Sequence, residues 1–234
     1  MLCCLLYAAL GIAMQWSSGV FDGSWTNEPD EASHFLNGLM VHDYLTSGLG
    51  EHPLRYAERY YQHYPRIALG HFPPLLATVE GVWFLIAPIS YPSAMVMIAL
   101  LASFTAAVTA WICARWFPFP LAFGSGLAWL LLPIVRRGTD VFMAEVLLTL
   151  MALLAVIGFS RRSLQFGFWS SLTLLTKGSG LALALLPPAA TLLSRCWGEV
   201  WKKWLWLSAA LVIAMAGPWY ALAPGALHQK VRSF

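Results

Sequence analysis

The residues best suited to chemistry are acidic, and most of them lie in one segment of the chain. Seven of the eleven Asp and Glu residues and five of the six His lie between Asp22 and His71. In this segment Asp30 and Glu31 are adjacent, in what we expect to be the first turn of a helix. A carboxylate can accept a proton from an attacking hydroxyl or bind a divalent metal ion. The pair therefore predicts acid–base or metal-assisted chemistry, and helix capping is the alternative interpretation.

Three further ionisable residues lie in positions that require an explanation. His34 follows Asp30 at the i, i+4 spacing, which permits a shared metal ion, although an ordinary solvated or interfacial histidine is the favoured interpretation. Glu80 and Glu145 lie inside apolar stretches, where a carboxylate is costly unless it is paired or faces a cavity. Glu145 follows Asp140 by about one helical turn, so we expect the two residues to line the same cleft.

The composition places these residues in a membrane protein. Of the 234 residues 59% are hydrophobic and 11% are charged, whereas about a quarter of a soluble domain is charged. The net charge of +3 is small and spread over loops, which argues against nucleic-acid binding. The four Cys residues are interpreted as small hydrophobic side chains in helices, not as disulfides or metal ligands. We predict an all-α, polytopic transmembrane helical bundle.

Seven apolar segments predict about seven membrane helices, since crossing the bilayer takes about 20 residues. They are residues 2–15, 93–114, 118–135, 141–160, 163–176, 178–194 and 204–223. The glycine-containing sequence Lys177-Gly178-Ser179-Gly180 predicts a break between two short segments, and Pro187 with Pro188 predicts a kink in the second of them. The first segment has no basic leader, so a retained helix is favoured over a cleaved signal sequence.

Residues 21–92 form the predicted first extracytoplasmic loop, which contains interfacial helices. Apolar residues recur there at three- and four-residue steps, which predicts a short amphipathic helix on the membrane that ends at Ser47-Gly48: Ala32, Phe35, Leu36, Leu39, Met40 and Tyr44. A stretch rich in Tyr and Arg, residues 55–66, suits a headgroup interface. Residues 72–92 contain Glu80 and several prolines, so we expect an interfacial or re-entrant helix, with a membrane crossing as the alternative.

Basic residues predict the orientation of the chain. With a cytoplasmic N-terminus and no crossing by residues 72–92, six basic residues that follow the first loop fall inside: Arg115, Arg161, Arg162, Arg195, Lys202 and Lys203. The exceptions are Arg136, Arg137 and Lys177, which fall on the side of the acidic loop. We expect them to bind an anionic ligand, or else to serve as interfacial anchors or snorkelling side chains.

Four motifs, in their order along the chain, resemble the GT-C membrane glycosyltransferases. The closest likeness is to the superfamily of dolichyl-phosphate-mannose protein mannosyltransferases and lipid A aminoarabinose transferases. The motifs are Asp30-Glu31, His71-Phe72-Pro73-Pro74-Leu75, Arg136-Arg137-Gly138-Thr139-Asp140 and Leu174-Leu175-Thr176-Lys177-Gly178. The resemblance implies a GT-C-like transmembrane domain over residues 1–234 that corresponds to the N-terminal catalytic half of such enzymes. The C-terminal part of the usual architecture is absent from this sequence.

The resemblance also implies a reaction and its acidic residues. A sugar is transferred, with inversion, from a polyprenyl-phosphate donor to a lipid, glycan or protein acceptor outside the cytoplasm. Asp30 is then the catalytic base and Glu31 supports it. Asp140 is a second acidic residue facing the same cavity, although it also suits the N-cap of the next helix.

Cationic and metal-binding roles follow from the same resemblance. Lys177, Arg136 and Arg137 would contact the donor phosphate, where cations stabilise the charge of the leaving group. His71 precedes Pro-Pro at a position where some relatives engage the lipid phosphate or a metal ion. The one cofactor we consider is a divalent metal ion held by Asp30 and His34.

Two alternatives to an active enzyme remain open. The chain could be a non-catalytic or transporter-like membrane component, or an inactive fragment of a glycosyltransferase. A transporter predicts charged residues along a path through the bilayer, whereas here the acids gather at one surface, which favours an enzyme. A second chain could supply the missing C-terminal region. We expect a multi-pass integral membrane protein, in contact with membrane lipid, in a bacterial plasma membrane with its active site on the extracytoplasmic face.

Overall fold

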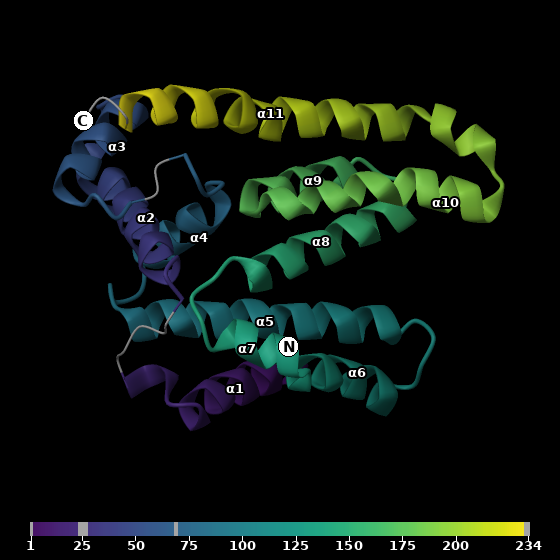
Figure 1. The fold of residues 1–234 in the computed structure, drawn as a ribbon. Helices are drawn as coiled ribbons and strands as arrows, with labels where there is room; N and C mark the ends of the chain where they lie inside the picture. Colours follow the sequence, from purple (N-terminus) through teal and green to yellow (C-terminus); the bar gives the residue numbers. More distant parts are fainter. Residues whose placement is uncertain (1, 23–27, 68–69, 232–234) are drawn as a thin grey trace. The chain divides into compact units, whose positions relative to one another are not determined.

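The computed structural model describes residues 2–22, 28–67 and 70–231, and this described part is helical (Figure 1). The helices are α1 (Leu2–Ser17), α2 (Glu31–Asp43), α3 (Pro53–His63), α4 (Leu75–Trp83), α5 (Tyr91–Cys113), α6 (Phe119–Leu131), α7 (Pro133–Thr139), α8 (Glu145–Ser160), α9 (Gln165–Thr176), α10 (Leu186–Ser194) and α11 (Lys203–Val231). Short turns of other helix types lie at Val20–Asp22, Tyr44–Gly48, Gly178–Leu185 and Trp197–Trp201. The all-α class is confirmed.

Among the described residues two helices are long and apolar enough to cross a membrane, namely α5 and the part of α11 from Lys203 to Ala221. A third span results if α6 and α7 count as one crossing that is bent by 63°. The predicted bundle of about seven spans is therefore not confirmed. α4 has nine residues and a length of about 14 Å, less than half of a ~30 Å hydrocarbon core. This length agrees with the expectation that residues 72–92 do not cross as one helix.

The chain divides into two compact units. Unit 1 contains residues 1–68 and 76–150, and unit 2 contains residues 69–75 and 151–234. The boundary falls inside α8, so that the first turns of this helix belong to unit 1 and the rest to unit 2. We describe each unit by itself.

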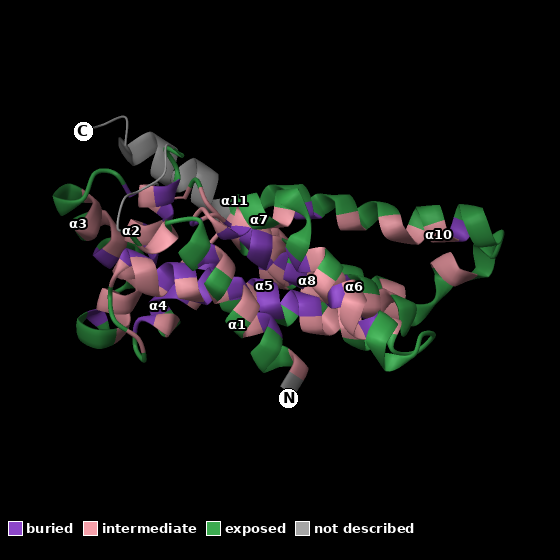
Figure 2. Cartoon of the chain, turned by 90° about the horizontal axis from the view of Figure 1, so that it is seen from below, coloured by how far each residue is buried: buried purple, intermediate pink, exposed green. Residues whose placement is uncertain are grey.

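Unit 1 is built around α5, against which α1 and α6 pack. The helix starts at an N-cap, Ser90, whose hydroxyl accepts a hydrogen bond from the backbone N–H of Ser93 at 3.3 Å. Along α5 the side chains of Met95, Ile98 and Ala102 are almost fully buried, and Figure 2 shows the corresponding purple segments. This helix is therefore the central element of the core of unit 1.

Gly126 marks the closest approach of α6 to its neighbours. A Cβ atom at this position would lie 2.5 Å from the Ala106 carbonyl oxygen of α5 and 2.6 Å from the Tyr7 hydroxyl of α1. Two residues earlier, a Cβ at Gly124 would meet nothing within 4 Å. The same helix thus offers one glycine that its packing requires and one that packing does not require.

We expect Gly126→Ala to lower the free energy of unfolding by ~1–3 kcal/mol, because the added methyl group must displace a backbone carbonyl. The matched control Gly124→Ala is expected to raise it by ~0.5–1 kcal/mol through helix propensity. Thermal unfolding in detergent, followed by circular dichroism, measures both. Equal midpoints for the two variants would contradict this packing.

Several predicted elements differ from those observed, and proline explains two of the differences. Residues 118–135 do not form one helix. The helix α6 ends at Leu131 and α7 begins at Pro133, because the proline ring prevents α6 from continuing. Pro187 and Pro188 do not kink a helix but occupy the first turn of α10, where proline is favoured. The break around Lys177 is confirmed, because α9 ends at Thr176 and a 3-10 turn begins at Gly178.

Unit 2 is organised by the contact of α9 with α11. Gly167 of α9 permits it, since a Cβ atom there would lie 2.6 Å from the Cα of Ser208 on α11. The Tyr220 hydroxyl of α11 donates a hydrogen bond to the Leu174 carbonyl of α9 at 2.7 Å. Figure 1 shows α9 lying along α11, with α10 preceding the start of α11.

Candidate functional site

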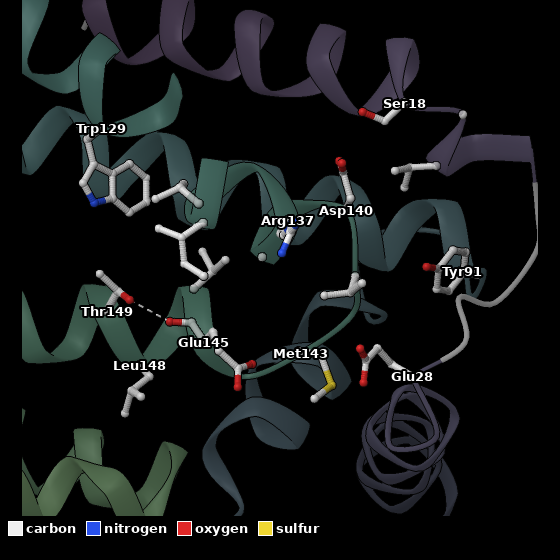
Figure 3. A pocket seen from close by; sticks show the side chains of 17 residues that line it. Ser18, Glu28, Tyr91, Trp129, Arg137, Asp140, Met143, Glu145, Leu148 and Thr149 are labelled. Carbon is white, nitrogen blue, oxygen red and sulfur yellow. Dashed lines mark hydrogen bonds between the residues drawn. The ribbon is translucent and has the colours of Figure 1, made fainter. Parts of the chain in front are cut away.

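A cavity of about 870 Å³ in unit 1 brings ionisable side chains from three segments together. Glu28 lies before α2, Arg137 and Asp140 lie at the end of α7, and Glu145 begins α8. Figure 3 shows these side chains around the opening, together with Ser18, Tyr91 and apolar residues such as Trp129, Met143 and Leu148. Three carboxylates and one guanidinium group thus line one cavity with largely apolar walls.

Asp140 is the carboxylate of the cavity with the clearest perturbation. It follows α7 directly, and its backbone N–H donates to the carbonyls of Arg136 at 3.1 Å and Arg137 at 3.3 Å. Burial raises the pKa of its carboxyl group, whereas hydrogen bonding with the Ser18 side chain and the charge of Arg136 oppose the rise. The interpretation of Asp140 as the N-cap of the following helix is wrong, because α8 begins only at Glu145.

Glu145 lines the same cavity as Asp140, as their spacing predicted. The intervening residues 141–144 are not helical, so the two carboxyl groups come from the end of one helix and the start of the next. Thr149 donates a hydrogen bond to the Glu145 backbone carbonyl at 2.8 Å, which Figure 3 draws as a dashed line.

Glu31 is fully buried and does not line the cavity. Its Oε1 atom accepts a hydrogen bond from the Tyr91 hydroxyl at 2.7 Å and another from the Phe142 backbone N–H at 2.6 Å. These bonds tie α2 to the start of α5 and to the segment between α7 and α8. Glu31 therefore holds in place the segment that carries Asp140, and Phe142 is only two residues from that aspartate.

Asp30 is exposed at the start of α2 and is not among the residues that line the cavity. Its backbone carbonyl accepts the His34 N–H at 2.9 Å, while its side chain makes no capping hydrogen bond. The two members of the predicted catalytic pair thus differ sharply in burial, and neither side chain reaches the cavity.

The inward face of α2 is polar, contrary to the amphipathic pattern predicted for this helix. Its buried residues are Glu31, His34, Asn37 and Gly38, whereas the apolar positions 35, 36, 39 and 40 are only partly buried. Gly38 is the physical reason that α4 can approach this face, because a Cβ atom there would collide with the carboxyl group of Glu80. The apolar periodicity of the sequence therefore identified the helix but not its buried face.

Glu80 is a buried acid whose carboxyl group lies against Gly38 of α2. Its side chain is 0% exposed, and neither carboxyl oxygen has a hydrogen-bond partner among the described residues. Burial raises the pKa of the Glu80 carboxyl group well above its ordinary value of 4.5. The neutral acid is thus the form that the fold accommodates.

We expect Glu80→Gln to remove a pH dependence of stability. A carboxyl pKa that is raised by folding contributes stability that is fully present below the unfolded-state pKa and is lost as the pH rises through the folded-state value. The wild-type chain should therefore lose unfolding free energy as the pH rises above the ordinary carboxyl value of 4.5, and the variant should lose less. Thermal midpoints across this range measure the difference, and equal slopes would contradict a neutral Glu80.

His34 is buried, so its interpretation as a solvated histidine is wrong. Within the described ranges 2–22, 28–67 and 70–231, no group of three or more His, Cys, Asp and Glu side chains could hold a metal ion. Within these ranges, therefore, no third His, Cys, Asp or Glu side chain joins the predicted metal ligands, exposed Asp30 and buried His34.

The residues predicted to bind the donor phosphate are distributed over both units. Arg137 lines the cavity, and the exposed Arg136 acts on Asp140 through its charge. Lys177 and His71 belong to unit 2. Lys177 is exposed between α9 and the following 3-10 turn, and the ring of His71 packs edge-on against Phe72 at 4.8 Å.

The tyrosines of α3 form a stack next to the end of α2. The rings of Tyr56 and Tyr60 lie 5.9 Å apart and those of Tyr60 and Tyr64 lie 4.9 Å apart. The Tyr60 hydroxyl donates to Asp43 Oδ2 at 2.8 Å, and burial together with this acid raises the pKa of the phenol. Tyr56 is buried, so this tyrosine packs within unit 1 and does not face a headgroup layer.

Sequence reasoning missed three residues that position the cavity. Gln15 is fully buried, and its Nε2 atom donates to the carbonyls of Met95 and Thr139 at 2.8 Å each, which joins α1, α5 and α7. The available sequence signal for Gln15 was its position as a single polar amide in an apolar predicted helix. Ser18 and Tyr91 carried no comparable signal, since their partners Asp140 and Glu31 are far away in the sequence.

Comparison of the chain with protein-family models, with curated proteins and with solved structures gives no match. The resemblance to GT-C enzymes therefore stays a prediction. In residues 2–22, 28–67 and 70–231 the structure defines an all-helical fold with two or three potential membrane spans and a carboxylate-lined cavity in unit 1.

Proposed function

We propose that the chain is a membrane glycosyltransferase that transfers a sugar, with inversion, from a polyprenyl-phosphate donor to a hydroxyl acceptor. The observation that supports this most strongly is the cavity of unit 1, where Asp140, Glu28 and Glu145 line a largely apolar space beside Arg137. A carboxylate base and a cation for the leaving phosphate are the groups that such a displacement needs.

In the proposed reaction Asp140 is the base, because its carboxyl group lines the cavity and that of Asp30 does not. The acceptor hydroxyl donates its proton to the Asp140 carboxylate while its oxygen attacks the anomeric carbon. The bond between that carbon and the phosphate oxygen breaks, and the electron pair leaves with the polyprenyl phosphate. One displacement at the opposite face of the sugar inverts its configuration.

The remaining polar groups of the cavity have supporting roles in this proposal. Arg137 stabilises the negative charge that accumulates on the departing phosphate. The raised pKa of Asp140 makes its carboxylate a stronger base than that of an exposed aspartate. Glu28 and Glu145 are placed to accept hydrogen bonds from sugar hydroxyls, since ionised carboxylates are acceptors only.

The proposal also includes the remaining predicted phosphate contacts, the membrane and the acceptor. Lys177 and His71 remain predicted contacts of the donor phosphate. We propose a multi-pass chain in a bacterial plasma membrane, with the cavity on the extracytoplasmic face and a lipid, glycan or protein as acceptor.

The test is product analysis with the purified chain in proteoliposomes. Radiolabelled polyprenyl-phosphate sugars are supplied with a panel of hydroxyl acceptors, and the released polyprenyl phosphate and the anomeric configuration of the product are determined. The proposal predicts one released polyprenyl phosphate for each glycoside formed, with inverted configuration. Binding of the donor without release would favour the non-catalytic alternative, and retained configuration would contradict the single displacement.

A further inference from the structure

Unit 2 contains an apolar pocket of about 360 Å³ that the proposed reaction does not use. Its walls come from α9, the 3-10 turn Gly178–Leu185, the start of α10, Val200 and α11. Leu174, Leu181, Val212 and Ile213 are typical of its lining. Several of its residues lie on the part of α11 that is long and apolar enough to cross a membrane. The hydrocarbon of a lipid is therefore the material most available to fill it.

Two hydroxyl groups in this pocket have no hydrogen-bond partner within the part of the chain that the structure describes. Ser170 is 6% exposed and Ser208 is 1% exposed, and both line the pocket. Neighbouring hydroxyls of α9 bond to carbonyls of their own helix, as Ser171 does with Gly167 and Thr173 with Trp169, both at 2.7 Å. A buried hydroxyl without a partner is uncommon and costly, so the pair indicates an acceptor that binds between α9 and α11.

A second pocket of about 250 Å³ adjoins the first one. The two share Pro187 and Leu205 in their walls. The second pocket is lined by more polar residues, including Arg162, Thr191 and Glu199, and by Trp204. The indole Nε1 of Trp204 is buried and has no acceptor among the residues described by the structure. This pocket thus offers a cation and an unpaired donor next to the apolar one.

The second pocket is lined by Arg162, from the connection between α8 and α9, and by Glu199, from the connection between α10 and α11, and the sequence around both connections is basic. Arg162 pairs with Glu199 at 3.3 Å, and the other charged side chains of these connections are all cationic: Arg161, Arg195, Lys202 and Lys203. Trp197 and Trp201 are 63% and 79% exposed beside them. Exposed tryptophans next to lysines and arginines are typical of the headgroup level of a membrane, where anionic lipids are attracted.

The order of these groups along α11 matches the order of groups in a phospholipid. Trp204 and Ser208 are four residues apart, hence one turn or about 6 Å along the axis. Val212 and Ile213 follow one turn deeper in the apolar pocket. Along α11 an indole donor thus precedes one hydroxyl donor, and apolar walls follow, while Arg162 and Ser170 lie on other segments of unit 2.

From this arrangement we infer that unit 2 binds one anionic glycerophospholipid. Its phosphate lies near Arg162 and the Trp204 indole, its ester carbonyls accept hydrogen bonds from Ser170 and Ser208, and an acyl chain fills the apolar pocket. A polyprenyl phosphate fits less well, because its hydrocarbon carries no acceptor for the two serines. The inference does not depend on the proposed sugar transfer.

Native mass spectrometry of the purified chain in detergent tests this site. The chain is titrated separately with phosphatidylglycerol, phosphatidylcholine of the same acyl chains and a polyprenyl phosphate. We expect one phosphatidylglycerol to be retained at the lowest concentration. Ser170→Ala combined with Ser208→Ala should weaken that binding about tenfold, the loss expected from two neutral hydrogen bonds. Arg162→Gln should abolish the preference for phosphatidylglycerol over phosphatidylcholine.

Two further variants separate binding from folding. Ser171→Ala removes an equally buried hydroxyl that already has a partner, and it should leave phosphatidylglycerol binding unchanged. Ala184→Trp fills the apolar pocket from the exposed 3-10 turn and should prevent retention of the lipid. Equal weakening by Ser171→Ala, equal binding of the polyprenyl phosphate, or no retained lipid in the folded wild-type chain would overturn the inference.

Discussion

Replacement of Asp140 by Asn is expected to lower the rate of sugar transfer by about 10²–10⁴-fold, the usual contribution of a positioned general base. The substitution removes the proton acceptor of the cavity and keeps the size of the side chain. Its effect on stability should be small, because burial already disfavours the charged carboxylate. Initial rates of transfer in proteoliposomes, together with thermal midpoints, measure both quantities.

Two companion variants make this result specific to Asp140. Asp30→Asn alters an exposed carboxylate outside the cavity lining and should retain most of the activity. Ser18→Ala removes a hydrogen bond that lowers the pKa of Asp140, so the acid limb of the pH–rate profile should move to higher pH. If Asp30→Asn lost most of the transfer activity and Asp140→Asn kept all of it, Asp30 and not Asp140 would be the base.

Glu31→Ala is expected to lower the free energy of unfolding by ~3–5 kcal/mol. The truncation removes the acceptor of the Tyr91 hydroxyl and of the Phe142 N–H, and leaves a gap between α2 and α5. An unsatisfied buried donor costs about 1–3 kcal/mol, and the lost packing adds to this. Thermal or denaturant unfolding in detergent provides the measurement.

Milder changes at the same place should rank below this truncation. Tyr91→Phe loses only the hydroxyl donor and should cost about 1–2 kcal/mol. Asp30→Ala, one residue away and exposed, should cost less than about 1 kcal/mol. A folded Glu31→Ala protein with wild-type stability but no activity would instead assign Glu31 a direct role in catalysis.

The helical class and most helix positions followed from apolar run length and from proline and glycine. The break at Lys177 could be predicted because Gly178 and Gly180 interrupt two short apolar runs. The bend between α6 and α7 could not, since the sequence around Pro133 is apolar enough to suggest one continuous span. The sequence did not predict the buried face of α2, because this face is determined by contacts with distant segments and not by local periodicity. Glu31 is hydrogen-bonded to Tyr91, and Gly38 lies against Glu80.

The candidate site was predicted in part. The pairing of Asp140 with Glu145 in one cavity depends on a spacing of five residues that the sequence displays. The separation of Asp30 from that cavity depends on which way the first turn of α2 faces, and this is set by the hydrogen bonds of Glu31. Adjacent residues of a helix point about 100° apart, so the burial of Glu31 leaves Asp30 exposed.

The most direct test of the central claim is sugar transfer by the wild-type chain and by Asp140→Asn in the same proteoliposomes, with a polyprenyl-phosphate sugar panel as donor. Our account predicts turnover by the wild-type chain with at least one donor and a loss of about 10²–10⁴-fold in the variant. No turnover by the folded wild-type chain with any donor, or equal turnover by both proteins, would contradict it.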